Sequence, residues 1–248
     1  MRAQLRAELL KQRSTATALA LILAMLGLIA LAVLLHTFGL EEGNLESSAE
    51  QLWVLGRGEF LATLFAALLG ALSITTEIRH GTIRPTLLVT PRRGRVIAAK
   101  VWTTTLIGAG FGLTGCALAA GIGTAVLRLR GIELQLDAGD YALLVFGGAV
   151  AAAFWAAIGV GLGAIIRNQV PTLIGICAWL LFVEGLLVGD VTGVGDVGRF
   201  APGAAAAAIS GQDPDELLGP TAGLVVLGVY AIVAALAGAV ATIRRDVA

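Results

Sequence analysis

The sequence has few charged residues and very few of the side chains that build metal or catalytic centres. Of its 248 residues, 14% are charged and 57% are hydrophobic, and the mean hydropathy is +0.89. Soluble domains carry about a quarter charged residues. The composition therefore indicates an integral membrane protein.

Cysteine, histidine and lysine are each present only twice. Cys116 and Cys177 lie in apolar runs, which favours burial as small apolar side chains over a disulfide or a metal pair. His36 and His80 are far apart in the sequence, so no metal-ligand cluster is predicted. No cleavable signal peptide is predicted, since the first apolar run is long and lacks a small-x-small cleavage site.

The two lysines also exclude a common nucleotide site. A phosphate-binding Walker loop needs lysine directly after glycine, but Lys11 follows leucine and Lys100 follows alanine. The chain therefore has no ATP site of this kind. Nothing in the apolar runs suggests a catalytic triad at one depth, and we expect no enzymatic activity, no metal and no nucleic-acid partner.

Six runs are long and apolar enough to cross a bilayer, which needs about 20 residues of helix. We predict an all-α membrane protein that forms a single transmembrane domain over 1–248. The predicted spans are about 16–36, 58–76, 100–127, 141–166, 170–189 and 217–243.

The basic residues lie mostly on one side of these spans. They concentrate in the N-terminal segment, in 77–99 and in the C-terminal tail, whereas the other loops are rich in acids. By the positive-inside rule, both termini are predicted to be cytoplasmic, in a multi-pass protein of the cell membrane. Residues 1–15 have leucines on one helical face and arginines on another, as in an amphipathic interfacial helix.

The external segment 190–216 is too long for a tight turn and is partly apolar. A short helix that dips back into the membrane from outside and an ordinary surface loop are both compatible with it.

The loop 77–99 has a pattern of its own. Thr82 can cap a short helix over 83–89 with Pro85 in its first turn, and Thr90-Pro91 is typical of a second helix start. Leu87, Leu88 and Val89 give the first helix an apolar surface beside arginines. Such a helix suits docking on a partner protein, although arginines that only set topology and bind lipid phosphates give the same pattern.

Residues 77–100 resemble the permease subunits of type-2 ATP-binding-cassette exporters. The resemblance rests on Glu77-x-Arg79-x-Gly81-Thr82, then Leu87-Leu88-x-Thr90-Pro91-x-x-Arg95, and Lys100 at the start of a span. It extends to nearly the whole chain, through the amphipathic N-terminal helix and the six spans.

The resemblance implies a partner and a set of roles. It implies a cytoplasmic coupling helix that sits on a separate ATPase, two copies of that ATPase with its ATP and Mg, and a second permease copy, most simply in a homodimer. The docking residues would be Gly81, Thr82, Ile83, Arg84, Leu87, Leu88 and Val89. Glu77 and Arg79 would lie at the loop junction, with Glu77 paired with Arg79 or Arg84.

In the family, spans two and five line the central path. By that analogy the candidate path residues are Thr63, Phe65, Trp179, Phe182 and Glu184. Glu184 is the only acid inside 170–189, where a carboxylate costs roughly 2.5–3.5 kcal/mol at mid-membrane. It therefore requires either a water-filled space or a structural partner, such as the N–H groups of a turn or Arg199.

Two other functions remain as alternatives. An ion-coupled carrier would use Glu184 as a proton or sodium site and would work without ATP. A membrane-embedded enzyme would need several polar residues at one depth. The glycine pairs Gly108/Gly112 and Gly159/Gly163 have the spacing of close helix contacts, which we expect within the subunit rather than at a dimer seam.

Overall fold

The computed structural model describes residues 5, 7–11, 16–82, 93–188, 195–212 and 217–244. These residues form helices and connecting turns, and no strand occurs among them. Six helical segments in this part of the chain are long and apolar enough to cross a membrane: 16–39, 48–79, 94–129, 138–166, 169–187 and 220–244. The predicted all-α fold is confirmed for the described residues, and its six long apolar helices agree with the predicted number of spans.

The first half of the chain forms three of these segments. Helix α2 (Ala16–Gly39) is followed by a short 3-10 turn (Glu42–Leu45), by α3 (Ser48–Leu55) and α4 (Arg57–Arg79), and then by α6 (Arg93–Leu129). The segment that contains the predicted span 58–76 starts earlier than predicted, because Ser47 and Glu50 form a capping box at the start of α3. The other predicted spans differ from the helices only at their ends.

The second half contains more interruptions. Helix α7 (Ala138–Ala142) joins α8 (Gly148–Ile166) through a π-helical turn (Leu143–Gly147), and α9 (Gln169–Ala178) joins α10 (Glu184–Val188) through a second one (Trp179–Val183). A 3-10 turn (Gly195–Phe200), the short helix α11 (Pro202–Ile209) and α12 (Pro220–Arg244) complete the fold.

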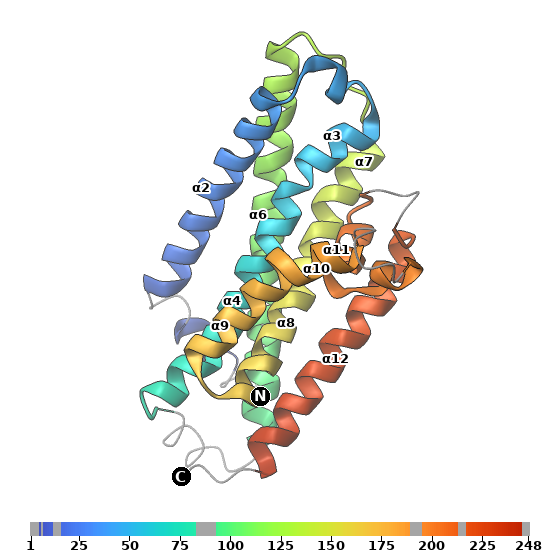
Figure 1. The fold of residues 1–248 in the computed structure, drawn as a ribbon. Coiled ribbons are helices and arrows are strands. Elements are labelled where there is room, and N and C mark those ends of the chain that lie inside the picture. Colours follow the sequence, from blue (N-terminus) through green and yellow to red (C-terminus); the bar gives the residue numbers. More distant parts are fainter. Residues whose placement is uncertain are drawn as a thin grey trace.

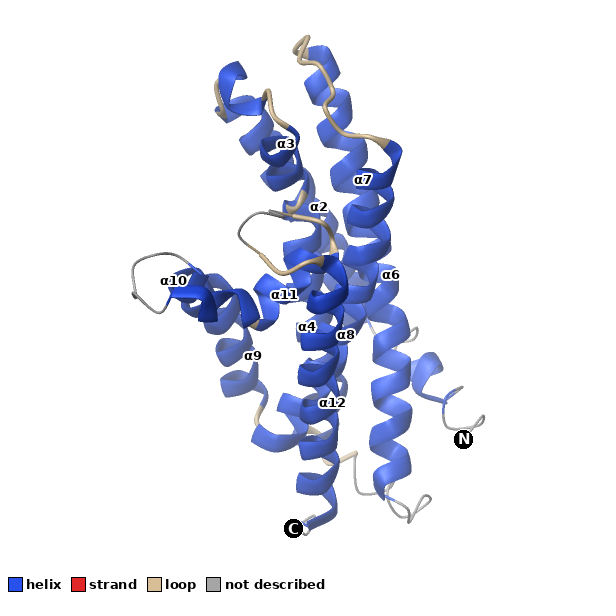
Figure 2. Ribbon diagram, turned by 90° about the vertical axis from the view of Figure 1, so that its right-hand side faces the viewer, coloured by secondary structure: helices blue, strands red, loops and turns tan. Residues whose placement is uncertain are grey.

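Helix α8 lies at the centre of the bundle and contacts α4, α6 and α12 (Figures 1 and 2). The described N-terminal helical residues 7–11 and the C-terminal end of α12 lie at the same end of the bundle (Figure 1). We call this the terminal end and the opposite one the distal end. Helices α2 and α12 lie at the periphery and expose apolar side chains such as Leu23 and Val225, as expected for surfaces that face lipid.

Glycine allows the central helices to approach closely. A Cβ at Gly70 of α4 would overlap the carbonyl oxygen of Ala156 in α8, and one at Gly159 of α8 would overlap that of Ala67 in α4. Gly108 and Gly112 face α8 in the same way. Gly163 is packed against Ala71 and Ile74 of α4. The predicted use of the glycine pairs for packing within the subunit is confirmed.

The segment 190–216, which is expected to be external, contains the buried helix α11. Its alanines Ala204, Ala205, Ala206 and Ala208 are buried, and the helix contacts α12, α8 and α4. The structure therefore has a short packed helix here, and its small side chains make that close fit possible.

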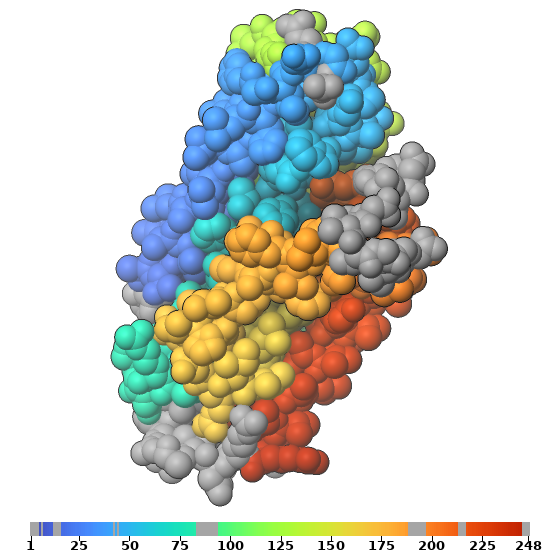
Figure 3. Space-filling view, in the orientation of Figure 1, coloured from blue at the N-terminus to red at the C-terminus, as the bar shows by residue number. Residues whose placement is uncertain are grey.

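The π-helical turn before α10 keeps one face of α9–α10 against the bundle. The buried residues of this segment are Thr172, Ile176, Leu180 and Glu184, at regular four-residue spacing. An α-helix would rotate such a series steadily away from one face, and a wider π turn offsets that drift. The rest of the segment forms a ridge between α4 and α12 (Figure 3).

We predict that Gly159→Ala lowers the thermal stability of the purified protein. The added methyl must push α4 and α8 apart, which costs about 1–3 kcal/mol for overpacking in a close contact. The measurement is thermal unfolding in detergent.

Gly110→Ala is the matched control. Gly110 lies in α6 with open space around its Cα, so an alanine there adds helix propensity of up to about 1 kcal/mol without a clash. Equal destabilisation by the two changes would contradict the packing assigned to Gly159.

Candidate functional site

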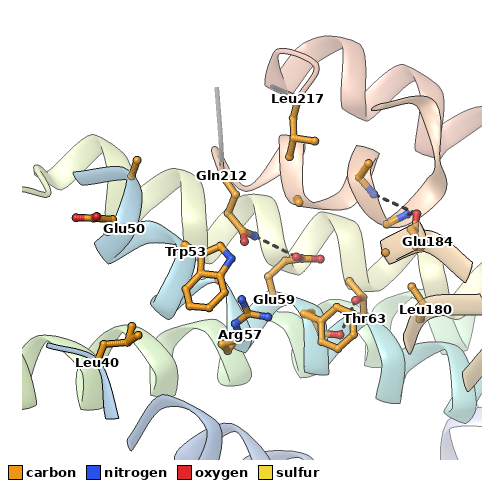
Figure 4. Close-up of a pocket in the computed structure, with 17 residues that line it drawn as sticks. Leu40, Glu50, Trp53, Arg57, Glu59, Thr63, Leu180, Glu184, Gln212 and Leu217 are labelled. Carbon is orange, nitrogen blue, oxygen red and sulfur yellow. Dashed lines mark hydrogen bonds between the residues drawn. The ribbon is translucent and has the colours of Figure 1, made fainter. Parts of the chain in front are cut away.

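A cavity of about 660 Å³ lies between α3, α4, α10 and α11. Its polar wall comes mainly from α4, with Arg57, Glu59 and Thr63 (Figure 4). Apolar side chains such as Phe60, Leu180 and Leu217 form much of the remainder. A cavity with a few placed polar groups among apolar walls is the usual form of a small-molecule site.

Glu59 is the most deeply buried acid of this cavity, at 3% exposure. Its Oε2 accepts a hydrogen bond of 3.1 Å from Nε2 of Gln212, which also donates to Oγ of Ser210 at 2.9 Å. Its Oε1 is buried and accepts no hydrogen bond. The Thr63 hydroxyl donates to the Phe60 carbonyl at 2.8 Å instead.

Arg57 lies on the other side of the same helix turn. Its guanidinium carbon is 3.8 Å from the centroid of the Trp53 ring, a cation–π contact. Its Nε is buried and has no hydrogen-bond partner. The Trp53 ring meets the His36 ring edge-on at 5.3 Å, which fixes the aromatic platform.

Glu184 caps a helix that cannot cap itself. The residue before α11 is Ala201, which has no side-chain acceptor, and Pro202 occupies the first turn. Oε1 of Glu184 accepts hydrogen bonds from the backbone N–H groups of Gly203 and Ala204, the latter at 3.2 Å. A carboxylate at a helix N-terminus is also favoured by the helix dipole. Of the two roles considered for Glu184, the structural one is present, and the residue still lines the cavity.

A second polar cluster lies at the terminal end of the bundle. The ammonium of Lys100 is 2.8 Å from Oε2 of Glu8 and 2.8 Å from Oε1 of Glu77, and it donates to the Ser73 carbonyl at 3.1 Å. Lys11 contacts the same two acids, each at 2.9 Å. We call Glu8, Lys11, Glu77 and Lys100 the ion cluster. It joins the N-terminal helical residues to the end of α4 and the start of α6.

Lys100 is the most deeply buried member of the ion cluster, with 1% of its side chain exposed, whereas the side chain of Lys11 is 44% exposed. Burial opposes the charge on Glu8, but Lys100 and Lys11 outweigh it and hold the pKa of Glu8 below its usual 4.5. Burial likewise opposes the charge on Lys11, and its bonds to Glu8 and Glu77 raise its pKa above 10.5. Both ionised groups therefore stabilise the fold at neutral pH. The contribution of Glu8 is lost as the pH falls through its lowered pKa, and that of Lys11 as the pH rises through its raised one.

The predicted path residues lie in different places. Thr63 and Glu184 line the cavity. Phe65 is buried in the apolar core with Met25 and Ala152. Trp179 and Phe182 are 38% and 68% exposed on the outside of α9–α10.

The predicted coupling residues are described only at the start of the loop. Helix α4 ends at Arg79, Gly81 has a left-handed φ of +70°, and the Thr82 hydroxyl donates to the Glu77 carbonyl at 3.4 Å. Ile83, Arg84, Leu87, Leu88 and Val89 lie outside the described residues.

The predicted pairing of Glu77 needs correction. Within the described part of the chain, Glu77 pairs with Lys100 and Lys11, while Arg79 donates to the Gln169 side chain at 3.4 Å. The reason is that the N-terminal helical residues and the start of α6 bring both lysines to Glu77, which the order of residues along the chain does not reveal.

Sequence reasoning missed most of the polar groups that the structure brings together. Glu8, Arg57, Glu59 and Gln212 were not singled out as site residues. A usable indication exists for Glu59 and Lys100, since each is a charged residue at the end of a long uncharged run. Gln212 gives no such indication.

Both cysteines are free; Cys116 is buried as predicted, and Cys177 is only partly so. Among the described residues, no three His, Cys, Asp or Glu side chains gather closely enough to hold a metal ion.

No family model matches this chain, and no curated protein sequence matches it significantly.

We predict that Lys100→Met lowers the free energy of unfolding by about 3–5 kcal/mol. Glu8 and the mostly buried Glu77 would lose the buried cation that they share and keep only the half-exposed Lys11. The measurement is unfolding of the purified protein at neutral pH. Lys11→Met is the control, since half-exposed ion pairs contribute roughly 1 kcal/mol or less. Equal effects of the two substitutions would show that Lys100 is not the centre of the cluster.

We predict that Glu184→Ala destabilises the protein by about 1–3 kcal/mol, because two N–H groups of α11 lose their acceptor. Glu184→Gln retains a carbonyl acceptor and should lose less stability. Thermal unfolding of both variants checks this order, and the reverse order would refute the capping role.

Proposed function

We propose that this chain is the non-catalytic membrane subunit of a transporter that is driven by ATP hydrolysis on a separate subunit. Its working form would contain a second copy of this chain and two ATP-binding-cassette ATPases, which bind ATP and Mg. The chain would export an amphipathic, lipid-like or drug-like compound from the cytoplasm, with both termini and the predicted coupling segment 77–99 on the cytoplasmic side.

One observation carries the proposal: helix α4 connects the ion cluster to the cavity. Glu77 of the cluster lies near its C-terminal end, and Glu59 and Thr63 of the cavity lie near its start. Glu59 and Glu77 are 18 positions apart on this helix, about 27 Å at the usual helical rise. A force applied to the loop after α4 would therefore reach the cavity through a single helix.

The ion cluster supports the same mechanism because it holds both ends of the loop. Glu77 precedes the loop and Lys100 follows it, and they are 2.8 Å apart in a buried ion pair. A partner that docks on this connection would act on a segment whose two ends are held together by the ion pair. Alternating access would follow from rigid movement of one copy against the other.

An ion-coupled carrier is the other candidate, and Glu59 favours it more than Glu184 does. Glu184 already caps α11, whereas Oε1 of Glu59 has no partner. This mechanism gives no role to the ion pair between Glu77 and Lys100. It predicts transport in vesicles that contain only this chain and an ion gradient.

We expect Leu87→Asp and Leu88→Asp to abolish co-purification with a candidate ATP-binding-cassette ATPase and to abolish ATP-dependent transport in vesicles. Placing a carboxylate on the apolar docking surface expected from the sequence would oppose burial in a protein groove. The measurements are pull-down, ATPase turnover and cargo uptake into inverted vesicles.

Leu129→Asp is the control for these variants. Leu129 lies at the distal end of α6 and is 83% exposed, so the same substitution there leaves the docking surface intact. If the ATPase still associates with the Leu87 and Leu88 variants, or if transport proceeds without any ATPase, the proposed function is wrong.

A further inference from the structure

Two groups of opposite charge in the cavity each have a buried atom without a hydrogen-bond partner. Nε of Arg57 and Oε1 of Glu59 are both buried atoms without a hydrogen-bond partner. In the described part of the chain, neither residue forms an ion pair. Buried polar atoms in native proteins nearly always have hydrogen-bond partners, so two such atoms without partners in one cavity require an explanation.

The two residues do not pair with each other. They are two positions apart on α4, and residues at that spacing leave a helix in different directions. Arg57 lies against Trp53, whereas Glu59 reaches toward Gln212 (Figure 4). A third group that carries both charges would match both at once.

The charges of the cavity exclude simpler ligands. An anion alone would bind Arg57 but would lie among Glu50, Glu59 and Glu184, which also line the cavity. A cation alone would bind Glu59 and leave Arg57 without a hydrogen-bond acceptor or counter-charge. Much of the remaining wall is apolar, with Phe60, Leu180 and Leu217, and it suits a hydrocarbon chain.

We propose that this cavity binds a zwitterionic amphiphile, with an ammonium group on Glu59, a phosphate or similar anion on Arg57, and its apolar part against Phe60, Leu180 and Leu217. A membrane phospholipid with an ethanolamine headgroup and a free single-chain amphiphile both have this chemistry. That such a molecule is the cargo rests on the proposed function; that it binds does not.

The test uses the purified chain in maltoside detergent, without an ATPase. Three probes with the same hydrocarbon chain length are titrated by calorimetry: lysophosphatidylethanolamine, lysophosphatidylglycerol and the alkylammonium. The zwitterion should bind at least about tenfold more tightly than either of the others, since each lacks one charge-assisted hydrogen bond. Equal dissociation constants for the three probes would overturn the proposal.

Two variants assign the contacts. Glu59→Gln should reduce the affinity for the zwitterion to that for lysophosphatidylglycerol, and Arg57→Gln should reduce it to that for the alkylammonium. Glu46→Gln and Arg128→Gln are matched controls, because both residues are exposed and neither lines the cavity; they should leave all three constants unchanged. If both cavity variants still bind the zwitterion more tightly than the other two probes, the assignment of its charges to Glu59 and Arg57 is wrong. If a cavity variant does not fold, the comparison of the three probes on the unmodified chain still tests the proposal.

Lipids that the protein retains through purification distinguish the two sources. Enrichment of phosphatidylethanolamine over its share in the membrane, lost in Arg57→Gln and Glu59→Gln, identifies a membrane lipid as the ligand. A headgroup preference in calorimetry without such enrichment identifies a free amphiphile. A headgroup preference without ATP-driven transport would overturn the proposed function alone, and coupled transport without any preference would overturn this inference alone.

Discussion

Lys100 sets the main constraint on this fold, because an ammonium group in an apolar bundle is stable only where protein groups replace its water. Removal of an ion from water costs several kcal/mol even after relaxation, and good geometry with additional hydrogen bonds is needed to offset it. Here Glu8, Glu77 and the Ser73 carbonyl surround the ammonium. They come from two separate stretches of chain, the N-terminal helical residues and α4, so the bundle must bring both to α6 before the lysine can be buried. The charge thus fixes the relative positions of the N-terminal helical residues, α4 and α6.

The same helix that ends in this cluster also carries the polar wall of the cavity, and its packing makes it a stiff connection. Along its middle, α4 lies against α8 so closely that a methyl group at Gly70 or Gly159 would overlap a backbone carbonyl. Interfaces of this density transmit displacement rather than absorb it. A displacement at Glu77 would therefore be transmitted to Glu59 along a closely packed helix rather than through a chain of flexible side chains.

The sequence was sufficient to predict those features that depend on local composition. Six apolar runs of spanning length, the paired glycines and the burial of Cys116 follow from hydropathy and spacing alone. Contacts between distant segments do not, and the site is built from these: Gln212 reaches Glu59 across 153 positions of the chain, and Glu8 reaches Lys100 across 92. The partner of Glu184 was narrowed to two alternatives because a buried carboxylate requires donors, but only the folded position of α11 decides between N–H groups and Arg199. The π turns were not predicted, since no residue pattern distinguishes them from α-helix in an apolar run.

The two walls of the cavity differ in how firmly they are held. The α4 wall is fixed by the glycine contacts with α8 and by the ion cluster at its far end. The opposite wall, α10 with α11, is held differently: α9–α10 buries a single line of four residues and exposes large apolar side chains such as Phe182 and Leu186 on its other faces. The bonds from α11 to Glu184 join α10 and α11 to each other and leave the cavity between them and α4 open. Helix α11 is itself packed against α12 and α8, so α10 is the less firmly held part of this wall. The volume of the cavity therefore depends chiefly on where α10 lies.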